Sequence, residues 1–326
     1  TIDGRATTVI YNIGGSGSGW GLTGNAGTDT TTNFIGTTDA MPFQIRVNNN
    51  KAATFGSDGG VALGEFTTAV GQALASGLES RATTTGAFAA GIRDTSENVG
   101  SFSAGVNSKA NGDYAFAMGQ NTKASGIGAF ALNGFTRATG DYSLAIGTGN
   151  LSSGENAFSG GTGSTATGAN SFSFGDANIT NAAKSVALNA GNITNGENSF
   201  AAGNTNIANG ENSAVFNVGN FANSDNSLAA GEQTRASANA SAAFGAGVVT
   251  KSYGQTSVGT FNDTTDAASA TGIDPGNTLF SVGIGADDSN RANALTVKGD
   301  GNVGIGTTAP DAKLEIIGTD TNVIST

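Results

Sequence analysis

The chain repeats itself every 14 residues from Phe88 to Gly259. Three residues after the first position of each copy comes Gly or Asn, the residues that accept a positive φ, which predicts a turn there. A second turn signal precedes the first position by four residues, as at Gly112 and Gly126. Two turns in each copy leave room for two short strands. The repeat therefore predicts a β-solenoid in which each copy forms one coil.

Side chains on a strand alternate between its two faces. In the first strand of each copy, one face carries large apolar residues such as Phe116 and Met118, and the other carries Ala and Ser. Packed sheets normally lie about 10 Å apart, so a coil this short closes only around small side chains. We therefore expect Ala and Ser inside, and an apolar ladder outside. The apolar ladder comprises Phe88, Phe102, Phe116, Phe130, Leu144, Ile146, Phe158, Phe172, Phe174 and Phe200.

An uncovered ladder of this length exceeds the apolar patches that monomers tolerate. We therefore predict that identical chains pack their ladders together, which makes the ladder a candidate oligomer interface. The alternative is a monomeric β-helix whose interior is filled by the large residues.

Composition agrees with an all-β chain. The sequence holds 52 Gly and only 3 Pro, and 12% of its residues are charged, which fits neither collagen nor a highly charged disordered chain. The 18 Phe residues argue against a flexible linker, and the Gly content disfavours helix. We expect three regions: a β-rich N-terminal region (1–66), the solenoid (67–262) and a β-rich C-terminal region (263–326). Strands are expected in the flanks at 8–11, 43–47, 52–55, 279–282, 294–297, 303–306 and 313–317, with a hairpin turn at 298–301.

Several classes of function are disfavoured. The chain has no Cys and no His, which excludes disulfides, thiolate chemistry and imidazole ligands. Its net charge of −11 argues against nucleic acid and anionic lipid as partners. No apolar run approaches the ~20 residues of a membrane span. We expect no catalytic residue, no cofactor, no metal and no membrane insertion. The first residues lack Met and a signal-peptide pattern, so we expect a processed chain or a fragment.

Three further rows follow from the repeat. Lys109, Lys123 and Arg137 occupy equivalent positions in successive coils and form a basic strip, which is either a contact for an acidic glycan or a solubilising face. A row of carboxylates recurs three residues before the first position. Calcium binding or glycoside hydrolysis would need paired carboxylates, and we favour a solvated edge instead. These carboxylates belong to Asp113, Asp141, Glu155, Glu197, Glu211 and Asp225.

The middle coils carry two Asn rows, which we expect to hydrogen-bond along the solenoid. The rows are Asn178, Asn192, Asn206 and Asn220, and Asn181, Asn195, Asn209 and Asn223. Between them lies a second apolar row of Ile179, Ile193, Ile207 and Phe221. This row is either a further contact between chains or a patch for a receptor.

The repeat, with Ser143–Gly147 closest to type, resembles the head repeat of the YadA-like trimeric autotransporter adhesins over about 190 residues. The resemblance implies a left-handed parallel β-roll in which three chains pack side by side. The stretch from Ala294 through Gly301–Thr307 to Ile316 is similar to the segment that precedes the self-cleaving chaperone domain of bacteriophage tail fibres. The stalk and membrane anchor of the adhesins and the chaperone domain of the tail fibres are both missing from this sequence.

These observations predict an extracellular attachment fibre rather than an enzyme. The favoured hypothesis is a homotrimeric tail fibre of a phage or injection-type particle that recognises a host-surface glycan or protein receptor. One alternative is a bacterial cell-surface adhesin head that binds matrix or neighbouring cells. A passive filament without a ligand, and a glycan depolymerase with a carboxylate cleft, are the others.

Overall fold

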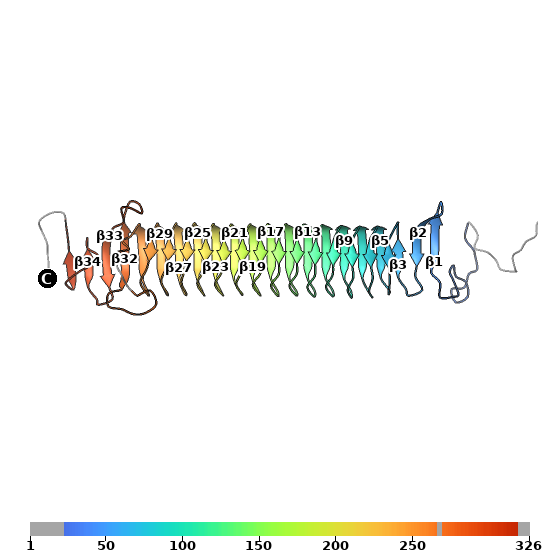
Figure 1. Cartoon of the computed structure of the whole chain (residues 1–326), viewed down its shortest axis with the longest axis horizontal. Coiled ribbons are helices and arrows are strands. Elements are labelled where there is room, and N and C mark those ends of the chain that lie inside the picture. The colour runs from blue at the N-terminus through green and yellow to red at the C-terminus, as the bar shows by residue number, and fades with distance from the viewer. Residues whose placement is uncertain (1–22, 266–268, 319–326) are drawn as a thin grey trace, which may run out of the picture.

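The computed structural model describes residues 23–265 and 269–318. All the regular secondary structure in these residues is β-strand. The strands stack along one axis into a straight rod (Figure 1). Two parallel sheets form its walls, one of longer strands and one of two-residue strands. Because neighbouring strands in a sheet lie about 4.8 Å apart, each coil adds about that length to the rod.

The long-strand sheet holds 21 strands and runs the whole length of the rod. Its solenoid strands are β5 (Leu74–Leu78), β7 (Phe88–Ile92), β9 (Phe102–Val106), β11 (Phe116–Gln120), β13 (Phe130–Gly134), β15 (Leu144–Thr148), β17 (Phe158–Thr162), β19 (Phe172–Asp176), β21 (Val186–Ala190), β23 (Phe200–Asn204), β25 (Ala214–Val218), β27 (Leu228–Glu232), β29 (Ala242–Ala246) and β31 (Thr256–Thr260). Its flanking strands are β1 (Phe43–Val47), β2 (Asn50–Phe55), β3 (Val61–Leu63), β32 (Thr278–Ile284), β33 (Asn293–Lys298), β34 (Val303–Ile305) and β35 (Leu314–Ile316).

The short-strand sheet holds 14 strands, one for each coil that it lines. They are β4 (Thr68–Ala69), β6 (Arg81–Ala82), β8 (Thr95–Ser96), β10 (Lys109–Ala110), β12 (Lys123–Ala124), β14 (Arg137–Ala138), β16 (Leu151–Ser152), β18 (Thr165–Ala166), β20 (Ile179–Thr180), β22 (Ile193–Thr194), β24 (Ile207–Ala208), β26 (Phe221–Ala222), β28 (Arg235–Ala236) and β30 (Val249–Thr250). Each of these strands has only two residues, such as Lys123 and Ala124 in β12, because the turn that contains Gly126 follows almost at once.

The register of the solenoid follows the repeat. Phe116 pairs with Phe130, Ala117 with Ala131 and Met118 with Leu132, each 14 residues further along the chain. The same offset joins every neighbouring pair from β5 to β31, as the sequence predicted. Parallel pairing continues into both flanks, from β3 to β5 and from β31 to β32. The long-strand sheet therefore crosses both expected boundaries, and the division into three regions stays a prediction.

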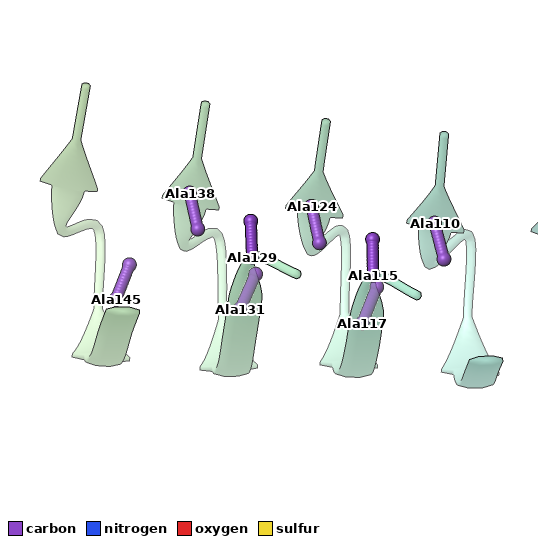
Figure 2. Packing of buried hydrophobic residues seen from close by; sticks show 8 residues of the cluster. All are labelled: Ala110, Ala115, Ala117, Ala124, Ala129, Ala131, Ala138 and Ala145. Atoms are coloured by element: carbon purple, nitrogen blue, oxygen red, sulfur yellow. The ribbon is translucent and has the colours of Figure 1, made fainter. Parts of the chain in front are cut away.

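The interior of the solenoid contains small side chains. Ala117 of the long-strand sheet and Ala124 of the short-strand sheet are both fully buried, and Figure 2 shows such alanines pointing toward one another from the two walls. Buried Ser residues fill other coils and donate their hydroxyl groups inward, as Ser152 does to the Leu144 carbonyl oxygen at 2.7 Å. The predicted small-residue interior is confirmed, and the alternative with large residues inside is wrong.

The turns differ in detail from the prediction. Gly119 has the predicted positive φ of 133°, but it lies within strand β11, and the turn itself follows at Asn121. Gly126 is needed for a different reason. A Cβ atom there would lie 2.1 Å from the carbonyl oxygen of Gly140, so any larger residue at this coil would force the next coil to shift. Glycine is therefore favoured in this repeat for two reasons: some positions have a positive φ, and others lie too close to the backbone of the next coil for a Cβ atom.

Beyond the parallel junctions with the solenoid, most of the flanking strands pair antiparallel, and only β35 joins its neighbour β34 in parallel. β1 and β2 form a hairpin and β2 pairs with β3, while β32, β33 and β34 form an antiparallel meander. The expected turn between β33 and β34 is confirmed by the hydrogen bond from the Gly301 N–H to the Lys298 carbonyl oxygen, at 3.0 Å. The strands predicted at 43–47, 52–55 and in the C-terminal region are confirmed, whereas the one at 8–11 lies outside the described residues.

Candidate functional site: the two outer faces of the solenoid

The apolar ladder lies on the outer face of the long-strand sheet. Its rings stack along the rod: Phe88 and Phe102 have centroids 4.9 Å apart, and Phe102 and Phe116 have centroids 4.4 Å apart with planes only 2° from parallel. A second stack joins Phe158 and Phe172 at 4.6 Å. Leu144 and Ile146 connect the two stacks. The ladder is thus one continuous apolar surface.

Each ladder residue is covered on its flanks by the neighbouring coils and is open outward. Phe130 is 44% exposed, Phe174 is 51% exposed, and Met118, which lies two positions after Phe116, is 45% exposed. From Phe88 to Phe200 the ladder spans nine coils, so this surface is about 40 Å long and, with two positions per strand, about 7 Å wide. A strip of that area is comparable to the largest apolar patch of a typical monomer, and patches of that size are often contact surfaces. The structure therefore brings all ten predicted ladder residues together, and their role as an interface between chains stays a prediction.

The outer face of the short-strand sheet points away from the apolar ladder. Lys109, Lys123 and Arg137 lie in register on β10, β12 and β14, so the structure brings the predicted basic strip together. The second apolar row continues the same line of positions, with Ile179 pairing with Ile193 and Ile207 with Phe221. One side of the rod therefore carries a basic segment followed by an apolar segment, and a ligand role for the basic strip stays a prediction.

The two Asn rows have different structural roles. In the exposed row, Asn181 donates to the Oδ1 of Asn195 at 2.7 Å, and Asn195 donates to that of Asn209 at 2.8 Å, as predicted. The inner row is buried and bonds mainly to the backbone. The Nδ2 of Asn192 donates to the carbonyl oxygens of Leu188 at 2.6 Å and Gly203 at 2.8 Å. The inner row thus satisfies carbonyl groups that the positive-φ residues turn into the interior.

The carboxylate row lies along an edge between the two sheets, and several of its members cap the preceding coil. The Oδ1 of Asp141 accepts from the Ile127 N–H at 2.9 Å, and the Oδ1 of Asp225 accepts from the Glu211 N–H at 2.9 Å. These contacts hold the edge of one coil against the next. Within residues 23–265 and 269–318, no group of three or more Asp or Glu residues is placed to hold a metal ion.

One feature of the outer face escaped sequence reasoning. A hollow of about 750 Å³ lies over β26, β28 and β30 beside the loop that follows β32, and Arg235, Lys251 and Arg291 line it. One indication of this site was present in the sequence. Arg235 occupies the same repeat position as Arg137, so the repeat places it on the same outer face. The position of Arg291 could not be found from the repeat, because this residue comes from the irregular C-terminal region.

The fold defines a class of protein: a parallel β-solenoid with 14-residue coils and an open apolar face. Within this class, the coils match the family model described as the YadA head domain repeat, over residues 97–122, 110–132 and 138–164. The central part of the chain is therefore a YadA-like head β-roll, and this points to an adhesin-type fibre. No curated protein matches the chain. In the part of the chain that the structure describes, no helix is long and apolar enough to cross a membrane.

Proposed function

We propose that this chain is a segment of a homotrimeric attachment fibre, in which three copies pack their apolar ladders around a common axis. The observation that carries the proposal is the outward-facing apolar ladder with its two stacks of Phe rings. Burying it releases about 25 cal/mol for each square ångström of apolar surface, which favours association of identical rods. A closed ring of copies also leaves no ladder uncovered.

The remaining surfaces suit recognition. If the ladder faces the axis, the outer face of the short-strand sheet is directed to solvent in every copy. It would present the basic strip and the second apolar row three times around the fibre, so that weak contacts add up through multivalency. The proposed partner is a glycan or protein receptor on a host surface.

We propose further that the fibre binds without catalysing a reaction. The carboxylates that sequence reasoning weighed for glycoside hydrolysis lie on an open edge. Several, including Asp141 and Asp225, accept hydrogen bonds from the backbone of the preceding coil. Incubation of the purified chain with capsule or other surface glycans should release no sugar, and release of reducing ends would overturn this part of the proposal.

The similarity of the C-terminal stretch to tail-fibre segments supports a fibre carried by a phage or an injection-type particle. In the structure this stretch forms β33, β34 and β35 on the end of the long-strand sheet. The match to the YadA head repeat favours a second candidate, an adhesin on a bacterial cell surface. Antibody labelling in electron micrographs separates the two: label on released particles supports the first, and label on the cell envelope supports the second.

The mass in solution tests the trimer. The chain should sediment at three times its mass of 31.9 kDa. Phe116→Asp places a charge in the ladder and should shift the mass toward that of the monomer. Lys123→Asp, in the same coil on the opposite face, should leave the trimer intact. If the unaltered chain is a folded, monodisperse monomer, the proposal is wrong.

A further inference from the structure

The geometry points to the hollow at the C-terminal end of the short-strand sheet as a binding site for an anionic saccharide. This inference rests on the proposed recognition function and assigns it a site and a class of ligand. The hollow lies on the outer face, away from the apolar ladder, so packing of the ladders would leave it open. Its volume of about 750 Å³ lies within the usual range for small-molecule sites.

Two local features shape the hollow. In the turn row that flanks the short strands, Gly219 and Gly247 line the hollow on either side of Gln233, at a position that varies between Gly and larger residues such as Phe135 in other coils. The loop after β32 then rises beside this row. The Gly285 N–H donates to the Thr260 carbonyl oxygen at 3.0 Å, and the Ala292 N–H donates to that of Phe261 at 3.1 Å. The two glycines leave room beside the side chains of the short strands, and the loop makes a wall.

The charge of the hollow is opposite to that of the chain. Arg235, Lys251 and Arg291 line it together with one carboxylate, Asp288, whereas the whole chain carries a net charge of −11. Arg291 has a structural role as well, because its Nη1 donates to the carbonyl oxygens of Gly247 at 2.9 Å and Asn262 at 3.2 Å, and its Nη2 pairs with Asp288. Arg235 and Lys251 are exposed. The local excess of positive charge favours an anion.

The neighbours of Arg235 indicate a saccharide in preference to a simple ion. Its guanidinium carbon lies 4.9 Å from the centre of the Phe221 ring, and Val249 follows in register on the next strand. Gln233 and Ser237 add amide and hydroxyl groups to the lining. Apolar faces, neutral hydrogen-bonding groups and a planar cation suited to carboxylate or sulfate together match a sugar that bears an acidic group. The negative charge elsewhere on the chain disfavours a nucleic acid.

Calorimetric titration of the purified full chain tests the site. The probes are a galacturonic acid tetrasaccharide, its methyl ester, a sulfated tetrasaccharide and inorganic sulfate. We expect binding of at least one acidic saccharide that weakens as salt is added, and the tighter of the two identifies the acidic group. Binding of the methyl ester as tight as that of the acid, inorganic sulfate binding as tightly as either saccharide, or no binding of either acidic saccharide would overturn the inference.

Arg235→Gln should weaken binding about tenfold or more, because it removes a charged hydrogen-bond donor from the site. The matched control is Arg81→Gln, which removes the same group at the same repeat position outside both the hollow and the basic strip, and it should leave binding unchanged. Equal weakening by both variants would contradict the site. Because Arg235 is exposed, its variant should unfold at the same temperature as the unaltered chain.

Failure of this inference can be told apart from failure of the proposed function by two parallel measurements. If the chain is trimeric and adheres to host cells but Arg235→Gln adheres and binds saccharides as before, the hollow is not the site. If the chain is monomeric or does not adhere, the proposed function itself is wrong.

Discussion

The buried carboxyl group of Asp94 accepts a hydrogen bond from the backbone N–H of Ser108, one coil further along, at 2.7 Å. In several later coils the equivalent position is Asn. Asn150 accepts from the Ser164 N–H at 2.7 Å in the same way, and its Nδ2 also donates to the Ile146 and Gly161 carbonyl oxygens. The Oδ2 of Asp94, which takes the place of that amide nitrogen, is buried without a hydrogen-bond partner. The repeat position that the inner row occupies therefore has an unsatisfied polar atom at the coil of Asp94.

Replacing Asp94 by Asn should repair this defect. The amide would keep the bond from Ser108 and add donors toward the carbonyl groups of Ala90 and Gly105, which correspond to Ile146 and Gly161. We expect a gain of about 1–3 kcal/mol in the free energy of unfolding at neutral pH. Urea denaturation followed by circular dichroism measures it. Unchanged or lower stability would contradict this account of the inner row.

The same residue should make stability depend on pH. Burial raises the pKa of Asp94 above its ordinary value of 3.8, against the opposing effect of the hydrogen bond from Ser108. Its contribution to stability is therefore fully present below the unfolded-state pKa and is lost as pH rises through the folded-state pKa. The advantage of Asp94→Asn over the unaltered chain should grow across that interval and then level off. A difference that does not change with pH would show that Asp94 does not titrate on unfolding.

The interior should not tolerate enlargement. Ala117 is fully buried between the two sheets, so Ala117→Leu should destabilise the chain by about 3 kcal/mol or more, because the walls must move apart. The matched control is Met118→Leu at the next residue, which points outward and should change stability little. Urea denaturation of both variants checks the difference. Similar stability for the two would contradict the close approach of the sheets.

Substitution of two glycines distinguishes the two reasons for glycine in the repeat, close contact between coils and a positive φ. Gly126→Ala would place a Cβ 2.1 Å from the Gly140 carbonyl oxygen and should disrupt the coil. Gly163 has a φ of 63° and open space around its Cα, so Gly163→Ala should cost only the left-handed conformation, about 1–2 kcal/mol. Thermal unfolding should rank Gly126→Ala as much the less stable. Equal melting temperatures would show that neighbouring coils shift apart easily.

The two Asn rows should differ in energetic weight. Asn192→Ala removes the donor to two buried carbonyl groups and should cost about 2 kcal/mol or more. Asn195→Ala, in the exposed row, should cost under about 0.5 kcal/mol, because water replaces the lost contacts. Urea denaturation of the two variants measures both costs. A larger loss of unfolding free energy for Asn195→Ala than for Asn192→Ala would contradict the assignment of the inner row as the more stabilising one.

Much of the fold could be predicted because one sequence period fixes one structural period. The spacing from Phe116 to Phe130 determines the strand register, and the small size of Ala117 and Ala124 determines which face is inside. The flanking strands were also predictable from their apolar patterns, although their pairing with the ends of the solenoid was not. Contacts at the ends depend on segments that do not repeat, so no period indicates their partners.

The 14-residue repeat by itself determined the solenoid, its small interior and the outward ladder, because each coil places equivalent residues against one another. Only the tertiary structure decided which glycines serve close approach and that Asp94 lacks a partner. The tertiary structure also created the hollow lined by Arg235 and Arg291. Arg291 lies 56 residues after Arg235 and comes from the loop after β32. Whether Arg235 and Arg291 lie close together depends on how the irregular C-terminal loop packs on the last coils. The local sequence does not indicate that packing.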